Sequence, residues 1–406
     1  MEDLKEIPVL LLTGYLGSGK TTLVNRILNN RKGIRFAVIV NDIGEVNIDA
    51  DLIQKGGVVG KKDESLVALQ NGCICCTLKN DLIQQLCEIT SRQAFDYIVI
   101  EASGICEPEP IAQTICSIPA LGYEYVKNGI PVLDCVVTVV DAMRMESEFA
   151  CGDALKKPHL DEEDIESLVI QQIEFCNIIA LNKVSEVTPE QLGRIRAIVR
   201  TLQPKAKIIE CDYGEFDLDE ILDTGMFQFD DVAASATWIQ EVEHHEDDDD
   251  DDDDDDHDHD HDDDEDHDHE HHHHHHHDGE GEAEEYGIGT YVYQARRPFD
   301  LNAFDNFVAK KWPKNVIRAK GLCYFSEEFD TCYLFEQAGR QFVLKNVGLW
   351  FATMPEEELI EKLREQPDLL RDWDRTYGDR MQKLVFIGQH LDKDFIRREL
   401  DNCLFE

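Results

Sequence analysis

A glycine-rich loop close to the start of the chain constrains the fold more than any other feature. Residues 14–21 read Gly-Tyr-Leu-Gly-Ser-Gly-Lys-Thr and match the pattern G-x-x-x-x-G-K-[ST]. Such a loop holds a phosphate when it joins a strand to a helix, because its backbone amides and the helix N-terminus point at the anion. The apolar run Val9–Thr13 precedes the loop, and the helical pattern Thr21–Leu28 follows it. The sequence therefore predicts the strand–loop–helix unit of an α/β fold.

Apolar segments alternate with helical patterns through the first 230 residues. Several of these segments are continuous and β-branched, which is typical of strands buried on both faces of a parallel sheet. The alternation predicts a doubly wound, mostly parallel α/β sheet. The predicted strands are Val9–Thr13, Phe36–Val40, Leu66–Leu69, Tyr97–Ile100, Leu133–Val140, Ile178–Leu181 and Lys207–Cys211. The predicted helices include Thr21–Leu28, Asp81–Thr90, Asp164–Phe175 and Pro189–Leu202.

The rest of the chain divides into a linker and a second domain. Over residues 231–286 the periodicity is lost, and runs of Asp and His cannot bury a core. We expect a disordered, acidic, His-rich linker there, between a P-loop domain over 1–230 and a small α+β domain over 287–406. The second domain is predicted to hold strands Thr290–Gln294, Val316–Gly321, Thr331–Glu336 and Phe342–Asn346, and helices Leu301–Val308, Glu356–Leu363 and Asp392–Leu400.

The chain carries a formal net charge of −46, of which −27 falls within residues 241–285. Nucleic acids and anionic membranes are disfavoured as partners, because both are bound through Lys and Arg. No secretory signal begins the chain, and no apolar run approaches the ~20 residues that span a bilayer. Most of the 13 cysteines stand singly in apolar segments, which is typical of reduced thiols (Cys135, Cys176, Cys323 and Cys332). We therefore expect a soluble, cytoplasmic protein.

The phosphate loop predicts a nucleoside triphosphate bound with Mg²⁺. Lys20 is expected to reach the β- and γ-phosphates, and the hydroxyl of Thr21 to bind Mg²⁺. The loop residues expected to contact the nucleotide are Gly14, Gly17, Ser18, Gly19, Lys20, Thr21 and Thr22.

The segment Glu101-Ala-Ser-Gly104 follows the predicted strand Tyr97–Ile100. It places a carboxylate and a glycine at the carboxyl edge of the sheet, where ligands bind in this architecture. We expect Glu101 to complete the Mg²⁺ shell or to orient a water molecule. The Gly104 amide is expected to sense the γ-phosphate.

The segment Asn182-Lys183-Val-Ser185 follows the predicted strand Ile178–Leu181 and resembles the guanine-reading motif Asn-Lys-x-Asp. We therefore predict that Asn182 and Lys183 bind the nucleotide, with GTP as the expected substrate. An Asp at the last position would accept two hydrogen bonds from the guanine edge, whereas Ser185 accepts fewer and carries no charge. Either base selectivity is relaxed, which leaves ATP open, or Glu186 takes the place of the Asp.

The segment Cys73-Ile-Cys75-Cys76 holds three thiols within four residues, just after the turn pair Asn71-Gly72. Thiolates favour Zn²⁺ or Cu⁺ over hard cations, and three of them leave a position for one more ligand. Glu45, in the acidic loop Asn41–Glu45, is the candidate fourth ligand. Two alternatives remain open: buried structural cysteines, or a redox pair, since Cys73 and Cys76 also satisfy C-x-x-C.

The linker is a second, looser candidate for metal binding. Fourteen of the 16 histidines lie between His244 and His277, and imidazoles bind Zn²⁺, Ni²⁺ and Cu²⁺. We favour weak metal capture over a purely solubilising spacer, because a solubiliser does not need histidine. The auxiliary ligands predicted there are His257, His259, His261, His267, His269, His271, His273, His275 and His277.

Taken together, these motifs resemble those of the CobW-type P-loop GTPases, a family of metallochaperones. The resemblance extends to the C-terminal part of the chain, which is similar to the zinc-responsive branch of that family. The motifs that carry it are the loop at 14–22, Asn41-Asp-Ile-Gly-Glu45, Asn71-Gly-Cys-Ile-Cys-Cys76, Glu101-Ala-Ser-Gly104 with Glu107-Pro108, Asn182-Lys183, Gly378-Asp379-Arg380, Leu384-Val-Phe-Ile-Gly388, Trp350 and Trp373.

The resemblance implies a metal site at the Cys-x-Cys-Cys motif, coupled to GTP through neighbouring loops, and a C-terminal domain that contacts a client. The resemblance also implies that Asp42 belongs to the Mg²⁺ and catalytic set, although relatives usually carry Glu there. Ser185 is the other departure from the family pattern, and Cys106, a further thiol beside Gly104, has no assigned role.

The predicted function is therefore that of a GTP-hydrolysing metallochaperone, which binds Zn²⁺ at Cys73, Cys75 and Cys76 and delivers it to a client apo-metalloenzyme. We expect nucleotide binding and zinc binding to change each other by the same factor. The alternatives are a cobalt, nickel or iron insertase, a zinc buffer with a vestigial GTPase, and a thiol redox sensor. The sequence gives no clear signal of oligomeric state.

Overall fold

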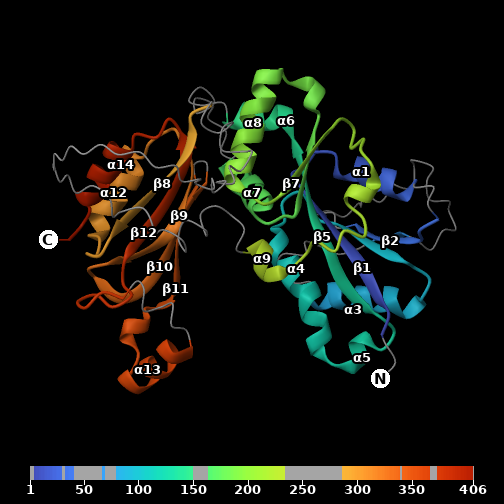
Figure 1. Ribbon diagram of the computed structural model, residues 1–406, viewed down its shortest axis with the longest axis horizontal. Helices are drawn as coiled ribbons and strands as arrows, with labels where there is room; N and C mark the ends of the chain where they lie inside the picture. The colour runs from blue at the N-terminus through green and yellow to red at the C-terminus, as the bar shows by residue number, and fades with distance from the viewer. Residues whose placement is uncertain are drawn as a thin grey trace, which may run out of the picture.

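The computed structural model describes residues 4–29, 33–40, 66–68, 79–149, 163–233, 286–338, 341–365 and 373–405. These residues build two sheets, each with helices of its own, and the first domain contributes both the phosphate loop and the Asn182-Lys183 segment (Figure 1).

The first sheet has seven strands in the order β3-β2-β4-β1-β5-β6-β7, and every described pair in it is parallel. All residues of β2, β4 and β6 are buried, which explains their continuous apolar sequences. The strands are β1 Glu6–Thr13, β2 Phe36–Val40, β3 Leu66–Ala68, β4 Tyr97–Glu101, β5 Ile130–Asp141, β6 Ile178–Asn182 and β7 Lys207–Cys211. The strands predicted here from sequence are confirmed, with Leu69 lying outside the described residues.

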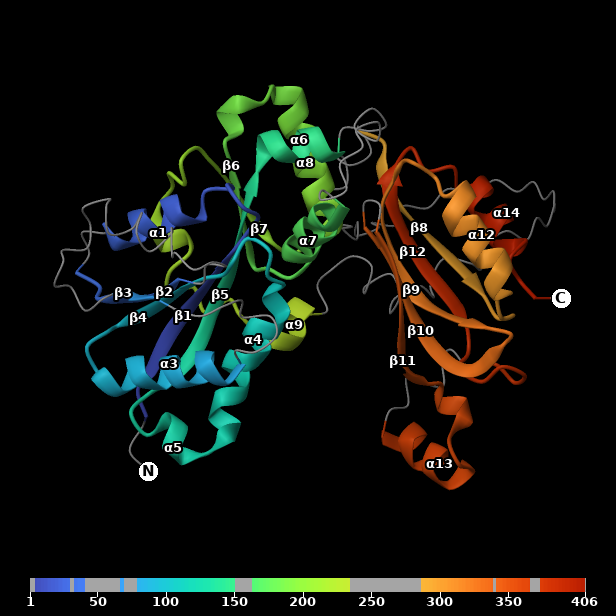
Figure 2. The ribbon, with the colours of Figure 1, turned by 180° about the vertical axis from the view of Figure 1, so that it is seen from behind.

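Helices cover both faces of this sheet, which confirms the doubly wound α/β prediction (Figures 1 and 2). Helix α1 packs on one face through Leu23, Val24 and Ile27, and α3, α4, α7 and α8 pack on the other. The described helices of the first domain are α1 Lys20–Leu28, α3 Lys79–Arg92, α4 Pro108–Ser117, α5 Tyr123–Val126, α6 Ala142–Phe149, α7 Glu163–Glu174, α8 Pro189–Leu202 and α9 Phe229–Ala233.

Two differences from the sequence-based expectations involve proline. Helix α4 was not predicted, yet it begins at Pro108, because proline is tolerated in the first turn, where its missing N–H would have no partner. Strand β5 begins at Ile130 rather than Leu133, because Pro131 weakens the strand pattern while β1 still pairs with this stretch.

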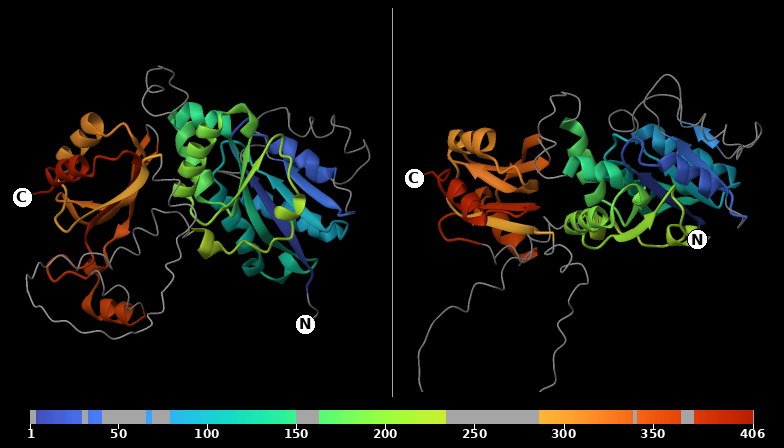
Figure 3. Two further views of the ribbon diagram at one scale, coloured as in Figure 1. Left: turned by 45° about the horizontal axis from the view of Figure 1, so that its top comes forward. Right: turned by 90° about the horizontal axis from the view of Figure 1, so that it is seen from above.

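The second sheet has five antiparallel strands in the order β11-β10-β9-β12-β8. Its core lies under α12 and α14, which are side by side on the face turned away from the first domain (Figure 3). The elements are β8 Ile288–Ala295, α12 Leu301–Lys311, β9 Val316–Phe325, β10 Glu328–Ala338, β11 Gln341–Leu349, α13 Glu356–Glu365, β12 Gln382–Gln389 and α14 Lys393–Asp401. The small α+β prediction is confirmed. Periodicity did not identify β12, because its apolar run Leu384–Ile387 is too short to distinguish a strand from a buried helix segment.

The other face of the second sheet contacts the first domain. Helix α7 contacts β10 and β11, and α8 contacts β8. Ile317 and Ile387 of the second sheet join the same buried cluster as Ile170 and Ile173 of α7. The two domains therefore share apolar packing, with α7 as the central element of the contact.

Within the described residues, no helix is long and apolar enough to cross a bilayer. The four cysteines that the sequence analysis assigned to apolar segments are buried free thiols (Cys135, Cys176, Cys323 and Cys332). Burial raises the pKa of both Cys176 and Cys332 to about 12, so these two thiols stay protonated at neutral pH.

Candidate functional site

The phosphate loop lies at the carboxyl edge of the first sheet, between β1 and α1. Gly14, Gly17 and Gly19 have φ values of +132°, +81° and +113°, a backbone region that L side chains rarely adopt. The Nζ atom of Lys20 donates to the carbonyl oxygens of Gly14 at 2.7 Å and Tyr15 at 3.0 Å. The lysine ammonium is thus held inside the curve of the loop, where the bound phosphates are expected.

Thr21 and Glu101 are brought together from different elements. The Thr21 hydroxyl donates to Glu101 Oε1 at 2.8 Å, and Glu101 is buried at the end of β4, beside β1. Hydroxyl and carboxylate oxygens are the ligands that Mg²⁺ prefers, and Mg²⁺ commonly binds through one or two carboxylates together with phosphates. The two side chains therefore fit a Mg²⁺ ion next to the phosphate loop, where it would neutralise the phosphate charge.

Gly104 lies against the phosphate loop. A Cβ atom added to Gly104 would be 2.6 Å from the backbone nitrogen of Leu16 and 3.0 Å from its Cα. Only a glycine allows this approach, since the neighbouring atoms belong to backbone that cannot move aside without changing the loop. The segment after β4 and the phosphate loop are therefore in direct contact, as a γ-phosphate sensor at Gly104 requires.

We predict that Gly104→Ala weakens GTP binding by about tenfold or more, because the added methyl group displaces the phosphate loop from its present position. Isothermal titration with a non-hydrolysable GTP analogue measures the effect. Gly289→Ala is the matched control, because a Cβ atom at Gly289 meets no atom within 4 Å. Equal affinities in the two variants would show that the close contact at Gly104 does not matter for binding.

Gln172 of α7 forms hydrogen bonds to the segment Gly104–Cys106, which follows β4. Its Nε2 atom donates to Cys106 O at 3.0 Å and lies 3.4 Å from Gly104 O, and the backbone carbonyl of Gln172 accepts from Thr138 Oγ1 at 2.7 Å. Cys106 itself is fully buried in the apolar cluster, so its side chain belongs to the core rather than to the exposed surface of the site. Sequence reasoning missed Gln172, which only a long-range contact reveals.

Asn182 supports the phosphate loop from the neighbouring side. Its Nδ2 atom donates to Ser18 O at 2.8 Å, and its Oδ1 atom accepts from Gly214 N at 3.2 Å. A Cβ atom at Gly19 would lie 2.4 Å from Asn182 Nδ2, so Gly19 and Asn182 are in contact. Lys183 forms an ion pair with Asp141 at the end of β5. The structure thus places Asn182 against the phosphate loop and Lys183 against the end of β5.

Several predicted site residues lie outside the described residues. They are Asp42, Glu45, Cys73, Cys75, Cys76 and all nine predicted auxiliary histidines. The elements on either side of the cysteine motif are described: β3 ends at Ala68 and α3 begins at Lys79. Within the described part of the chain, no group of three or more His, Cys, Asp or Glu side chains is placed to hold a metal ion.

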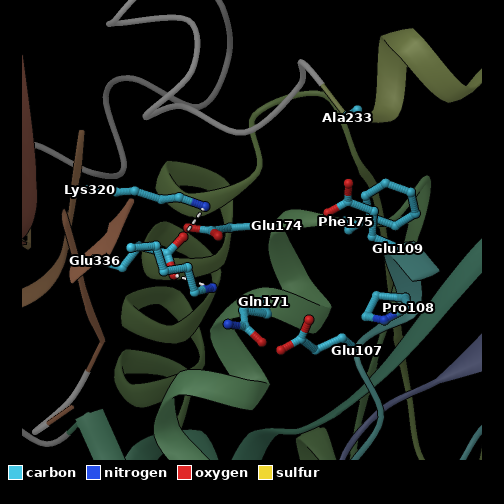
Figure 4. A pocket seen from close by; sticks show the side chains of 10 residues that line it. Glu107, Pro108, Glu109, Gln171, Glu174, Phe175, Ala233, Lys320 and Glu336 are labelled. Atoms are coloured by element: carbon cyan, nitrogen blue, oxygen red, sulfur yellow. Dashed lines mark hydrogen bonds and ion pairs between the residues drawn. The ribbon is translucent and has the colours of Figure 1, made fainter. Parts of the chain in front are cut away.

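A cavity of about 340 Å³ opens between the two domains (Figure 4). Its lining begins with Glu107, three residues after Gly104. Glu107 and Pro108 line it from the first domain, and Lys320 and Glu336 from the second. Lys320 Nζ lies 2.6 Å from Glu336 Oε1 and Lys345 Nζ lies 3.3 Å from Glu336 Oε2. Burial alone would raise the pKa of Glu336, but Lys320, Arg318 and Lys345 together outweigh it and lower that pKa, which keeps the carboxylate charged.

A buried ion pair joins the domains beside this cavity. Arg318 of β9 donates from Nε to Glu174 Oε1 at 2.9 Å and from Nη2 to Oε2 at 3.0 Å. The Arg318 side chain is 1% exposed and that of Glu174 is 8% exposed. The sequence shows a charged residue, Arg318, within the predicted strand Val316–Gly321. It does not show the partner, because Glu174 lies 144 residues away.

Two family models match the chain. One, described as CobW/HypB/UreG, nucleotide-binding domain, matches residues 8–210, and the other, described as cobalamin synthesis protein cobW C-terminal domain, matches residues 288–404. Together they cover the two domains seen in the structure.

Curated relatives are similar over all or part of the chain. The "Zinc-regulated GTPase metalloprotein activator 1" of Dictyostelium discoideum is 33% identical over 98% of this chain and 80% of its own length. The protein of the same name in Schizosaccharomyces pombe is 39% identical over 54% of this chain and 49% of its own length. The "Zinc chaperone CobW" of Pseudomonas aeruginosa is 33% identical over 55% of this chain and 61% of its own length.

Proposed function

Because the chain belongs to the CobW/HypB/UreG family and is a P-loop GTPase, we propose that it is a metallochaperone that delivers zinc to a client metalloenzyme. GTP is the substrate that it hydrolyses, with Mg²⁺ as cofactor. The Zn²⁺ ion is the cargo, and Cys73, Cys75 and Cys76 are its proposed ligands.

The observation that carries the proposal is the place of the cysteine motif in the chain. The motif lies in the ten residues between β3 and α3, and β3 runs parallel to β2 and β4 in the sheet whose carboxyl edge holds the phosphate loop. Three thiolates in that connection suit Zn²⁺. The names of the relatives, a zinc-regulated activator and a zinc chaperone, support the same metal over cobalt, nickel or iron.

We propose that nucleotide state reaches the client through α7. Gln172 of this helix contacts the carbonyls of Gly104 and Cys106, next to the phosphate loop, and Glu174 of the same helix holds Arg318 of the second domain. A change at Gly104 on GTP binding would therefore act on the helix against which the second domain docks.

The domain limits that we propose are 1–230 and 287–406. The His-rich segment between them is proposed to be an auxiliary zinc store.

The experiment that tests this function is a zinc titration by chelator competition on the full chain. It is performed with Mg²⁺ and a non-hydrolysable GTP analogue, and repeated with GDP. We expect a tight site whose affinity differs at least several-fold between the two nucleotides, and by reciprocity zinc must change the affinity for GTP by the same factor.

Two variants assign the site. Replacing Cys73, Cys75 and Cys76 with Ser is expected to remove the nucleotide-sensitive zinc site, whereas Cys116→Ser, at an exposed free thiol, is expected to leave it intact. Deleting residues 241–285 is expected to remove only weak sites. A tight site that ignores nucleotide would contradict the coupled chaperone, and loss of most zinc binding with 241–285 would indicate a buffer instead.

A further inference from the structure

The position at which GTPases of this kind carry a guanine-reading aspartate is occupied by Ser185, but a carboxylate lies next to it in space. Asp212 follows β7, one strand further along the sheet, and its Oδ1 atom accepts hydrogen bonds from both Ser185 Oγ at 2.9 Å and Ser185 N at 3.1 Å. We propose that Asp212 reads the guanine base, and that Ser185 serves to hold it in place. This inference rests on GTP being the substrate.

The loop that carries Asp212 is tied to the Asn-Lys segment at two points. Ser185 holds Asp212 at one end, and Gly214 N donates to Asn182 Oδ1 at the other. Asn182 in turn holds the phosphate loop through Ser18 O. These contacts fix the position of Asp212 relative to the phosphate loop. They also place Asp212 beside the segment Asn182–Ser185, which corresponds to the guanine-reading motif.

The backbone of this loop is shaped to make both contacts. Tyr213 has φ +53° and Gly214 has φ +65°, so two consecutive residues are left-handed and turn the chain back toward Asn182. A bulky residue rarely adopts this conformation, and such strained positions persist where the surrounding contacts determine them. Tyr213 is 74% exposed, so burial of its ring does not account for the strain.

The hydrogen bonds of Ser185 also determine which atoms face the ligand. Both of them use Oδ1, and no hydrogen bond to Oδ2 is seen among the described residues. A carboxylate oxygen accepts hydrogen bonds only, and the Watson–Crick edge of guanine offers two donors, N1–H and the N2 amine. Adenine carries no hydrogen on N1 and no amine at C2, so Asp212 would bind guanine in preference to adenine.

Glu186 is the other carboxylate of the same turn, and it differs from Asp212 in its surroundings. It lies in the exposed 3₁₀ turn Val184–Glu186, and no hydrogen bond to its carboxylate is seen in the described part of the chain. An exposed glutamate that is not held in position loses rotamer entropy on binding a base, whereas Asp212 is already oriented. The structure therefore favours Asp212 over Glu186 as the substitute for the missing aspartate.

The test is Asp212→Asn in the full chain, with affinities for GDP, xanthosine diphosphate and ADP measured by competition against a fluorescent GDP. Ser185 N–H requires an oxygen acceptor, so the Asn carboxamide is expected to keep its oxygen on Ser185 and to present its NH₂ group to the base. That group opposes the guanine donors but donates to the C2 carbonyl of xanthine. We expect GDP to bind about 10- to 100-fold more weakly, xanthosine diphosphate to bind about tenfold or more tightly, and ADP to change little.

Glu186→Gln is the matched control, and it is expected to leave all three affinities unchanged. The gain of xanthosine diphosphate binding cannot arise from a damaged fold, so it separates base reading from instability. Should Asp212→Asn fail to fold, Ser185→Ala is expected to weaken GDP severalfold without affecting ADP. A GDP-to-xanthosine diphosphate preference that is unchanged in Asp212→Asn, a switch produced by Glu186→Gln, or a Ser185→Ala variant that binds GDP like the wild type would each overturn the assignment.

The outcomes also separate this inference from the proposed function. If the wild-type chain prefers GDP to ADP and Asp212→Asn reverses the base preference, Asp212 is assigned whether or not zinc responds to nucleotide. If zinc affinity depends on nucleotide while Asp212→Asn leaves base preference intact, the metallochaperone proposal stands and this inference fails.

Discussion

Lys20→Ala is expected to lower kcat for GTP hydrolysis by about 100- to 1,000-fold, the effect of removing one preorganised donor from a transition state that carries phosphate charge. The ammonium lies within the curve of the phosphate loop and donates to the carbonyl oxygens of Gly14 and Tyr15. Steady-state phosphate release at saturating GTP measures the change. Lys127→Ala is the control, because Lys127 is a surface residue at the C-terminal end of α5 and pairs with Glu124 of that helix.

Zinc binding in the absence of nucleotide should be the same in Lys20→Ala and in the wild type, because Lys20 is not among the proposed zinc ligands. Nucleotide should, however, no longer shift the zinc affinity of the variant. A kcat within threefold of wild type would show that Lys20 is not the phosphate-binding lysine.

Arg318→Met is expected to destabilise the docked arrangement of the two domains by about 3–5 kcal/mol, the usual effect of leaving one partner of a buried ion pair unpaired. Glu174 is buried and accepts two hydrogen bonds from Arg318. The substitution therefore leaves a buried carboxylate between α7 and β9 without its partner. Urea unfolding followed by tryptophan fluorescence, together with protease sensitivity at the domain contact, measures the effect. We also expect GTP to lose its influence on the second domain.

The double variant Arg318→Met with Glu174→Leu provides the control. Apolar side chains of similar size often replace a buried ion pair with little change in stability, so much of the loss should be recovered. If the single variant is as stable as the wild type, the pair does not hold the domains together. If the double variant is stable but transmits no nucleotide signal, the pair serves communication rather than docking.

Local patterns were enough to predict the elements that position the nucleotide. The loop at 14–21 and the strand and helix around it are contiguous in sequence, so their pattern can be recognised locally, although β1 forms its backbone hydrogen bonds with the distant strands β4 and β5. The buried strands β2, β4 and β6 were visible because a strand covered on both faces is apolar throughout. The start of β5 was predicted three residues too late and α4 was not predicted, because the effect of a proline depends on where in the element it stands.

The roles of single polar residues depended on partners far away in the chain. Glu101 was predicted near Mg²⁺ from its place at the end of a strand, and the structure puts Thr21 Oγ1 2.8 Å from it. Gln172, by contrast, gave no sequence signal, since a glutamine on a helix is ordinary until its carbonyl partners at Gly104 and Cys106 are seen.

By itself, the sequence determined the fold class, the phosphate loop and the family, because these follow from the spacing of glycines, thiols and apolar residues along a short stretch. It left open whether base selectivity is relaxed or whether Glu186 reads the base. Only the tertiary structure decided that Asp212 lies against Ser185, 27 residues earlier, and that Glu174 meets Arg318 across 144 residues. Parallel strands bring their carboxyl ends to one edge whatever the length of chain between them, so contacts at that edge cannot be inferred from sequence separation.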